Sequence, residues 1–364
     1  MQVPTASPAL PKADVAELRF DKVRILADDL TGACDSAAAF LAPGNTVRVW
    51  LGAIASHPAS ESVQAFNTAS RNMETLAAAN AVSQAVPAIS TDARTLWFKK
   101  VDSAGRGAIA AEVLAAHKAL AMRAVLFAPS FPAAGRTVRE GVLNIVDAAG
   151  ITTEIPLLPE FHKFAATIHL SHPDRLTDSL HGAATVIVCD ASTQEDLEML
   201  AAINTPEILF AGSAGLAKAL AAVHFQAKLT HVEPIPRVAR PITIAGSPHR
   251  VTRLQMNHLT QALPQHMAMQ IAADATDEDI ILTQFTQHSP DALILTGGDT
   301  ALLVLRTLGA HSILLHGEMC PGIPWGFIQG GLAHGRIVVT KSGGFGSVDS
   351  LTHIVQQLTG DTSE

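Results

Sequence analysis

Short apolar runs alternate with segments of helical period along most of this chain. The apolar runs predict strands buried on both faces, because such strands read as nearly continuous apolar stretches. The alternation predicts an α/β fold, in which a mostly parallel sheet is flanked by helices. The strands are expected at residues 23–27, 47–51, 63–66, 96–101, 124–128, 185–189, 208–211, 242–245, 267–272 and 292–296.

Helices are expected between several of these strands. Their apolar residues recur with a period close to 3.6. The segment 135–158 lacks that period and is rich in Thr, Val and Ile, which favours a β-hairpin. The helices are predicted at residues 33–41, 71–86, 107–121, 194–203, 251–263, 277–288 and 300–308.

A proline-rich break divides the alternation into two parts. Pro234, Pro236 and Pro241 lie among polar and charged residues, a composition typical of a linker. The chain has 364 residues, which is above the size at which single cores usually divide. We therefore expect a loose extension at 1–20 and two domains at 21–232 and 233–364. Each domain would hold a mostly parallel sheet, with the ligand cleft between them.

Composition narrows the range of partners. The net charge of −8 argues against nucleic acid or an anionic membrane as the main partner. No apolar run approaches the roughly 18 residues of a membrane span, and residues 1–20 lack the apolar core of a signal peptide. The three cysteines, Cys34, Cys189 and Cys320, lie far apart, as expected in a reducing compartment. A cytoplasmic protein is therefore predicted, while self-association as a homo-oligomer stays open.

Two adjacent carboxylates, Asp28 and Asp29, close the first predicted strand and precede Thr31 and Gly32. Ligands of open α/β sheets bind at the carboxyl ends of strands. Carboxylates there accept hydrogen bonds from substrate hydroxyls, hold a metal, or take a proton from a nucleophile. The alternative is that one Asp only caps the following helix. Either Asp28 or Asp29 is a candidate catalytic base.

A second polar group follows the strand at 96–101. Gly105 and Gly107 allow tight backbone geometry, so side chains between them can converge on a ligand. A guanidinium offers a bidentate fork to a carboxylate. The alternative is a surface turn with solvated charges. Candidate substrate-binding residues are Lys100, Asp102, Ser103 and Arg106, with Arg71 and Arg136 after neighbouring strands.

The C-terminal part contains three strand-to-glycine turns, at 244–247, 295–300 and 339–346. Backbone N–H groups at a helix N-terminus after such a turn form a phosphate cradle. Lys341 would add a countercharge. Together these turns predict a nucleotide-binding site at Ser247, Gly297, Gly298, Asp299, Thr300, Lys341, Gly343 and Gly344.

Several familiar motifs are missing from the sequence. There is no Walker A pattern, no G-x-G-x-x-G and no H-E-x-x-H. His162, His169 and His172 have a spacing that matches no zinc pattern, so no metal-ligating residues are predicted. Ser213, in Ala211-Gly-Ser-Ala-Gly215, resembles a nucleophile elbow and leaves a hydrolase as an alternative.

Seven motifs in order resemble the four-carbon acid sugar kinase family. They cover about residues 23 to 352. They are Ala27-Asp-Asp-Leu-Thr-Gly-Ala33, Lys99-Lys-Val-Asp-Ser103 with Arg106-Gly107, Phe131-Pro-Ala-Ala-Gly-Arg136, Gly212-Ser-Ala-Gly-Leu-Ala217, Gly297-Gly-Asp-Thr300, Pro321-Gly-Ile-Pro324 and Thr340-Lys-Ser-Gly-Gly-Phe-Gly346.

The resemblance implies a sugar-acid-binding N-terminal domain, a nucleotide-binding C-terminal domain and ATP-dependent phosphorylation of a hydroxyl. The substrate would be a tetronate such as threonate, erythronate or an oxo-tetronate, and Mg²⁺ would bridge phosphate oxygens of ATP. It places Asp28, Asp29, Lys100, Asp102, Ser103 and Arg106 on substrate positions. It places Ser247, Gly297, Gly298, Asp299, Thr300 and Gly343 on ATP positions.

One motif departs from the family. The family usually reads Asp-Ser-Thr-Leu-Arg-Gly-Asn, whereas this chain reads Asp102-Ser-Ala-Gly-Arg-Gly-Ala108. A hydroxyl and an amide that would face the substrate are thereby lost. The departure leaves open a homologue that binds nucleotide and sugar acid without turnover.

Overall fold

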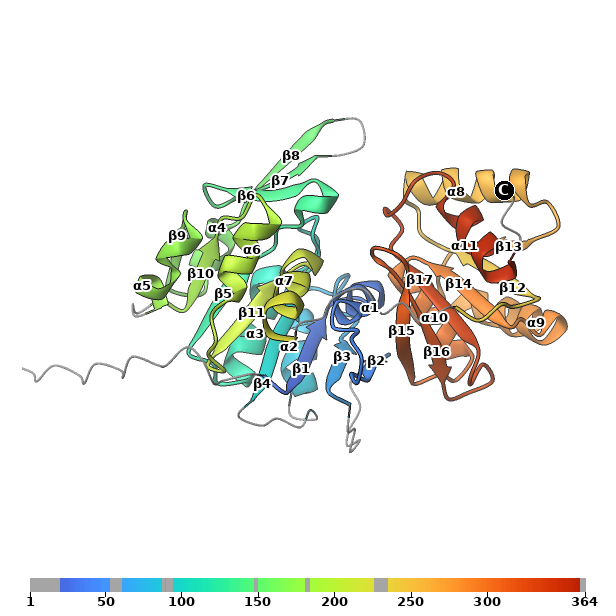
Figure 1. The fold of residues 1–364 in the computed structure, drawn as a ribbon, viewed down its shortest axis with the longest axis horizontal. Helices are drawn as coiled ribbons and strands as arrows, with labels where there is room; N and C mark the ends of the chain where they lie inside the picture. The colour runs from blue at the N-terminus through green and yellow to red at the C-terminus, as the bar shows by residue number, and fades with distance from the viewer. Residues whose placement is uncertain are drawn as a thin grey trace, which may run out of the picture.

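The computed structural model describes residues 20–52, 61–86, 89, 94–146, 150–180, 184–225 and 235–360. Within them a fourteen-stranded sheet runs through the whole molecule, with helices on both faces (Figure 1). The strand order is β13-β12-β14-β17-β16-β15-β2-β3-β1-β4-β11-β5-β10-β9. Most of the predicted extension and the first part of the predicted linker lie outside the described residues.

The N-terminal half supplies eight parallel strands of this sheet and the helices around them. Its elements are β1 (Lys22–Ala27), α1 (Leu30–Ala38), β2 (Val47–Trp50), β3 (Val63–Asn67), α2 (Thr75–Ala85), β4 (Thr95–Lys100), α3 (Ile109–Ala119), β5 (Ala124–Ala128), β6 (Arg136–Arg139), β7 (Val142–Val146), β8 (Thr152–Pro156), α4 (Leu158–His162), β9 (Thr167–Leu170), α5 (Leu176–Leu180), β10 (Val186–Cys189), α6 (Gln194–Ala201), β11 (Ile208–Gly212) and α7 (Ala214–Phe225).

The C-terminal half continues the sheet with four parallel strands and an antiparallel pair. Its elements are β12 (Pro241–Ala245), α8 (Arg250–Ala262), β13 (Met267–Gln270), α9 (Glu278–His288), β14 (Ala292–Thr296), α10 (Gly298–Thr307), β15 (Ser312–Cys320), β16 (Ile323–Gln329), β17 (Ile337–Lys341) and α11 (Ser350–Thr359).

The apolar runs form strands because both of their faces are covered. In β1, Ile25 packs into one buried cluster while the next residue, Leu26, packs into the cluster on the opposite face. Alternate side chains of a strand point to opposite faces, so a strand between two helical layers must be apolar throughout. This explains why β1 reads as a continuous apolar run that ends where the polar residues Asp28 and Asp29 begin.

The predicted α/β class and every predicted strand are confirmed, with small shifts at the ends. Two details differ. The segment 135–158 forms three antiparallel strands, β6, β7 and β8, rather than a hairpin, and they project from the N-terminal half (Figure 1). The pair β15–β16 was not predicted, although β15 joins the halves by pairing antiparallel with β2. No described helix is long and apolar enough to cross a membrane.

Candidate active site

A cavity of about 650 Å³ lies between the two halves. It is formed by the loops that follow β1, β3 and β4 on one side and β12, β14 and β17 on the other. The carboxyl ends of these parallel strands therefore meet at one place, as expected for open α/β sheets. Every predicted site residue lines the cavity except Asp28 and Lys341.

Asp29 is both a helix cap and a cavity residue. Its Oδ1 accepts a hydrogen bond of 2.9 Å from the Gly32 N–H at the first turn of α1, and its Oδ2 accepts one of 2.6 Å from the Thr31 hydroxyl. The cap is therefore confirmed, and it leaves Asp29 on the cavity wall. The cap fixes the carboxylate at the N-terminus of α1, the positive end of the helix dipole.

Arg71 lines the cavity and links three carboxylates. Its Nε lies 2.7 Å from Asp28 Oδ2, its Nη2 lies 2.8 Å from Asp29 Oδ1, and its Nη1 lies 3.6 Å from Asp102 Oδ1. Burial would raise the pKa of Asp28, but the charges of Arg71, Lys99 and Lys100 hold it below its usual value. The structure thus places Asp28 where it orients Arg71, away from the open cavity.

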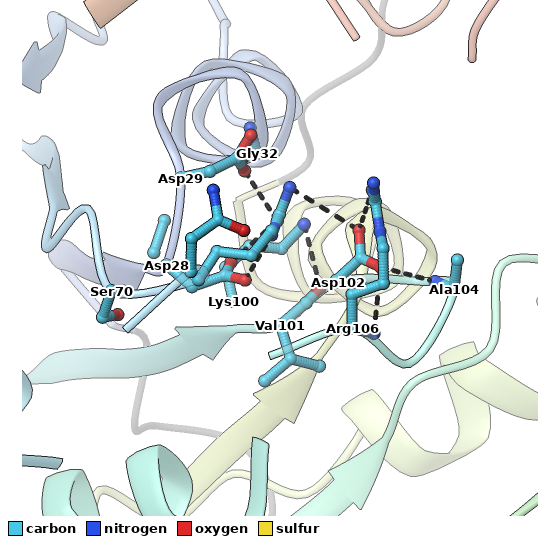
Figure 2. A network of polar contacts seen from close by, with 12 residues as sticks. Asp28, Asp29, Gly32, Ser70, Lys100, Val101, Asp102, Ala104 and Arg106 are labelled. Atoms are coloured by element: carbon cyan, nitrogen blue, oxygen red, sulfur yellow. Dashed lines mark hydrogen bonds and ion pairs between the residues drawn. The ribbon is translucent and has the colours of Figure 1, made fainter. Parts of the chain in front are cut away.

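The loop after β4 is organised around Asp102 (Figure 2). Arg106 donates to both Asp102 oxygens at 2.8 Å, and the backbone N–H groups of Ala104 and Arg106 donate to Oδ2 at 3.2 Å. Burial would raise the pKa of Asp102, yet the hydrogen bonds from Arg106 and the charge of Arg71 hold it well below its usual range. Beside this loop, Lys100 Nζ donates to the Val101 carbonyl at 2.9 Å.

Arg136 brings an unpaired positive charge to the same wall. Its Nε is buried without a hydrogen-bond partner, and it forms no ion pair among the described residues. Burial lowers the pKa of the neighbouring His249, as do the charges of Arg106, Lys341 and Arg136. Because Arg106 and Arg136 both line the cavity and both act on His249, this part of the cavity fits an anionic ligand such as a carboxylate or phosphate.

Glycines on the opposite wall let three backbone turns converge. Gly297 precedes α10 with φ +103°, a conformation that favours glycine, and its N–H donates to the Lys341 carbonyl at 2.9 Å. A β-carbon built on Gly343 would overlap Ser247 Oγ, so only glycine fits there. The turns at 246–249, 297–300 and 342–345 therefore present backbone groups to the cavity, which is the arrangement that binds phosphate.

Lys341 lies behind this wall and is fully buried. Its Nζ donates to the carbonyls of Ser342 at 2.8 Å and Phe345 at 3.1 Å. Burial lowers the pKa of Lys341 to about 7. In this structure the side chain ties the glycine loop together, rather than presenting a charge to the cavity as the sequence suggested.

Several cavity residues were missed by the sequence reasoning. Asp35 lies on α1 one turn beyond Thr31, so its helical spacing from that motif was the available signal. Asn72 follows Arg71 and donates to Asp299 Oδ2 at 3.0 Å, which links the two halves. Phe131, His249 and Phe345 belong to motifs already noted, but nothing in their spacing marked them as lining residues.

Ser213 does not have the surroundings of a nucleophile. It is fully buried and its Oγ donates to the Ser130 carbonyl at 2.8 Å. His334, a histidine that follows it in the sequence, accepts a hydrogen bond from the Gly330 N–H at 3.1 Å and not from Ser213. The Ser213 hydrogen bond therefore links the start of α7 to the loop after β5. The geometry gives no support to a hydrolase.

The sequence matches two family descriptions. Residues 23–161 and 160–220 match a sugar-binding N-terminal domain, and residues 279–351 match a nucleotide-binding C-terminal domain. The chain is 30% identical over 403 residues to a D-threonate kinase of Bordetella bronchiseptica, covering 92% of this chain and 97% of the relative. It is 28% identical over 431 residues to a D-threonate kinase of Salmonella typhimurium, covering 93% and 100%.

The fold is shared with a solved protein of Salmonella typhimurium LT2. The two superpose with a TM-score of 0.70 at 18% identity, over 93% of this chain and 99% of the other. At this identity the similarity establishes the fold alone.

Proposed function

The chain belongs to the four-carbon acid sugar kinase family, and from this premise we propose that it transfers the γ-phosphoryl group of ATP to a hydroxyl of D-threonate or a closely related tetronate. Three curated relatives at 28–30% identity carry the name D-threonate kinase. The sugar-binding match falls within residues 21–232 and the nucleotide-binding match within 233–364, which supports these as the two domain ranges.

One observation carries the proposal beyond family membership. The cationic wall of the N-terminal half and the glycine turns of the C-terminal half face each other across a single cavity. At their junction the N-termini of α1 and α10 meet, where Gly298 abuts Asp29. A sugar acid on one wall and a nucleotide on the other would thus bring a hydroxyl to a terminal phosphate.

The residues on the nucleotide side fit ATP. Gly297, with its positive φ, and Gly343, where a β-carbon would overlap Ser247 Oγ, keep side chains off the backbone of the turns that line the cavity. Phosphates would be held by the turns at Ser247, Gly297–Thr300, Gly343 and Gly344, as the sequence predicts. Lys341 would support them indirectly, by holding the loop from behind.

Magnesium would be held mainly by phosphate oxygens and water. The described residues include no group of three or more His, Cys, Asp or Glu side chains suited to a metal, and Mg²⁺ on nucleotides usually needs only one or two carboxylates. When bound, ATP supplies the phosphoryl group and Mg²⁺ neutralises charge on its oxygens. The carboxylates that line the cavity are sufficient to supply one or two ligands to Mg²⁺.

On the substrate side, Arg106 and Arg136 would hold the carboxylate of the sugar acid, because they form the cationic end of the cavity. Asp29, fixed by its cap and by Arg71, would accept a hydrogen bond from a substrate hydroxyl and orient it. Lys100, Asp102 and Ser103 would complete the substrate contacts. Catalysis would come largely from positioning and from electrostatic stabilisation in a site shielded from water.

The test is ATP consumption with Mg²⁺ against a panel of C3 to C6 sugar acids that includes threonate, erythronate and oxo-tetronates. We expect ADP to form with a four-carbon acid and not with its longer homologues. Nucleotide binding with no turnover on any acid would instead favour the non-catalytic homologue. That outcome would trace to the altered segment 102–108.

Charge recognition is tested by Arg136→Ala, which should raise KM for the acid about tenfold or more, because a charge-assisted hydrogen bond contributes about 1.5–3 kcal/mol. Arg139→Ala is the matched control, since Arg139 lies on the same strand but is exposed, and within the described ranges its side chain bonds only to Ser192. Equal KM values for Arg136→Ala and Arg139→Ala would show that Arg136 does not bind the acid.

A further inference from the structure

Asp35 is a buried carboxylate on the cavity wall, and neither substrate nor nucleotide binding as proposed requires it. It lies on α1, is 7% exposed and lines the cavity. Its Oδ1 is buried and has no hydrogen-bond partner in the described part of the chain. A buried, unpaired carboxylate costs free energy, so its retention needs a reason other than stability.

The carboxyl group of Asp35 faces the C-terminal half. A β-carbon built on Gly322, in the turn between β15 and β16, would lie 3.7 Å from Asp35 Oδ1 and 3.0 Å from the Phe345 ring. Phe345 belongs to the glycine loop of the nucleotide side. Asp35 thus extends from the substrate half towards the place where the phosphates would lie.

The other carboxylates of the substrate wall are already occupied. Asp29 accepts from Gly32, Thr31 and Arg71, so both of its oxygens hold donors. Asp102 accepts two hydrogen bonds from the Arg106 side chain, and Asp28 lies outside the cavity. The arginine charges hold the pKa values of Asp28 and Asp102 below their usual value, which makes these two carboxylates weak bases.

We propose that Asp35 is the general base of the phosphoryl transfer, a role that rests on the proposed kinase function. The substrate hydroxyl would donate to the Asp35 carboxylate, while Asp29 accepts a hydrogen bond from a neighbouring hydroxyl of the same acid and so fixes the orientation of the acid. As the hydroxyl oxygen forms its bond to the γ-phosphorus, the bond from that phosphorus to the β–γ bridging oxygen breaks and ADP leaves with the electron pair. The hydroxyl proton passes to the Asp35 carboxylate and then to solvent.

The surroundings of Asp35 suit this role. Burial raises its pKa, and the nearby charge of Asp29 adds to the rise, while Lys100 and Lys218 oppose it. Glu318 on β15 faces the same region, and burial also raises the pKa of that carboxyl. A base with a raised pKa accepts a proton more readily near neutral pH than an ordinary carboxylate does.

The test is Asp35→Asn, which keeps the shape of the side chain and removes the proton acceptor. We expect kcat to fall about 10²- to 10⁴-fold, the usual contribution of a positioned base, while KM for ATP and for the acid changes less than about threefold. Thermal unfolding should occur at the same or a higher temperature, because an unpaired buried charge is removed. An unchanged or higher unfolding temperature would show that a loss of kcat in Asp35→Asn does not come from misfolding.

The pH profile separates a base from a binding group. In the wild type, kcat/KM should fall on the acid side as Asp35 becomes protonated. The residual activity of Asp35→Asn should lack that limb. The matched control is Glu318→Gln, a neighbouring, partly buried carboxylate that does not line the cavity and accepts from Gly322 N–H at 2.7 Å. It should keep kcat within about twofold and keep the acid limb.

The outcomes distinguish the two proposals. A wild-type enzyme that phosphorylates a tetronate, with Asp35→Asn retaining kcat within about threefold, overturns the role of Asp35 alone. A rise in KM with unchanged kcat does the same, because it marks a binding group. A wild-type protein that phosphorylates no sugar acid overturns the proposed function and this role with it.

Discussion

Gly298 and Asp29 are in contact across the boundary between the two halves: a β-carbon built on Gly298 would overlap Asp29 Oδ2. Asp29 caps α1, and Gly298 begins α10. Two helix N-termini therefore converge on one carboxylate, which places positive helix-dipole ends around it. The absence of a side chain at position 298 sets the distance between the halves at the cavity.

Gly298→Ala should push these helices apart and lower kcat/KM about 10²-fold, because a displacement of about 1 Å at a reacting centre costs that much. Stability should change little, since alanine favours the helix by up to about 1 kcal/mol over glycine. Steady-state kinetics and thermal unfolding measure both effects. Thr307→Ala, at the other end of α10, is the control and should remain fully active. Full activity of Gly298→Ala would contradict the close-contact argument.

Arg71→Met should destabilise the protein by about 3–5 kcal/mol, because it leaves buried carboxylates without their shared cation. The side chain of Arg71 is 14% exposed and that of Asp28 only 3%. Urea unfolding at pH 7 checks this. Arg123→Met, which removes a largely exposed pair with Glu207, should cost only about 0–1 kcal/mol. Similar losses of unfolding free energy in Arg71→Met and Arg123→Met would show that the buried network of Arg71 stabilises the protein no more than an exposed ion pair does.

Acidification should reduce the difference between wild type and Arg71→Met. The folded pKa of Asp28 lies below its unfolded value of 3.8, so its contribution is complete above that value. The contribution is lost as pH falls through the folded pKa. Urea unfolding repeated at decreasing pH below about 4 measures the effect. If the difference in unfolding free energy between wild type and Arg71→Met stays constant over this pH range, Asp28 is not the carboxylate that Arg71 stabilises.

Lys341→Met should change how stability depends on alkaline pH. Burial lowers the folded pKa of Lys341 to about 7 from 10.5, so between these values the unfolded chain binds more protons than the folded one. Wild-type stability should therefore rise with pH, relative to the Met variant, from about 7 to about 10.5. Chemical unfolding across this range measures it. The unfolding free energy of Lys118→Met, which changes an exposed lysine, should depend on pH as that of the wild type does. The same pH dependence in Lys341→Met would show that the pKa of Lys341 is not lowered in the folded protein.

Ser213→Ala should retain kinase activity within about twofold and lose about 1–3 kcal/mol of stability, because the buried Ser130 carbonyl loses its donor. Coupled ADP assays and urea unfolding measure these effects. An esterase activity of the wild type that disappears in this variant would revive the hydrolase alternative.

The strands were predictable because each is covered on both faces, which demands an unbroken apolar run such as that of β1. The pair β15–β16 was not predictable by the same rule, since both strands include partly exposed positions and polar residues that interrupt the apolar run. The site residues that follow strands, such as Asp29 and Gly297, were found from local chemistry. Asp35 was not, because its only signal was its position one helical turn after Thr31, and that spacing indicates the cavity only once α1 is placed against it. The cytoplasmic location and the oligomeric state stay predictions.

The sequence by itself determined the α/β class, the strand positions and the motifs of both walls, because these depend on local pattern and on the chemistry of neighbouring residues. The tertiary structure decided what those residues do. It turned Asp28 and Lys341 away from the cavity and left Asp35 unpaired within it. Such differences depend on which groups from distant segments lie within hydrogen-bond distance. Arg71 and Asp28, 43 positions apart, meet only after the parallel strands β1 and β3 have paired.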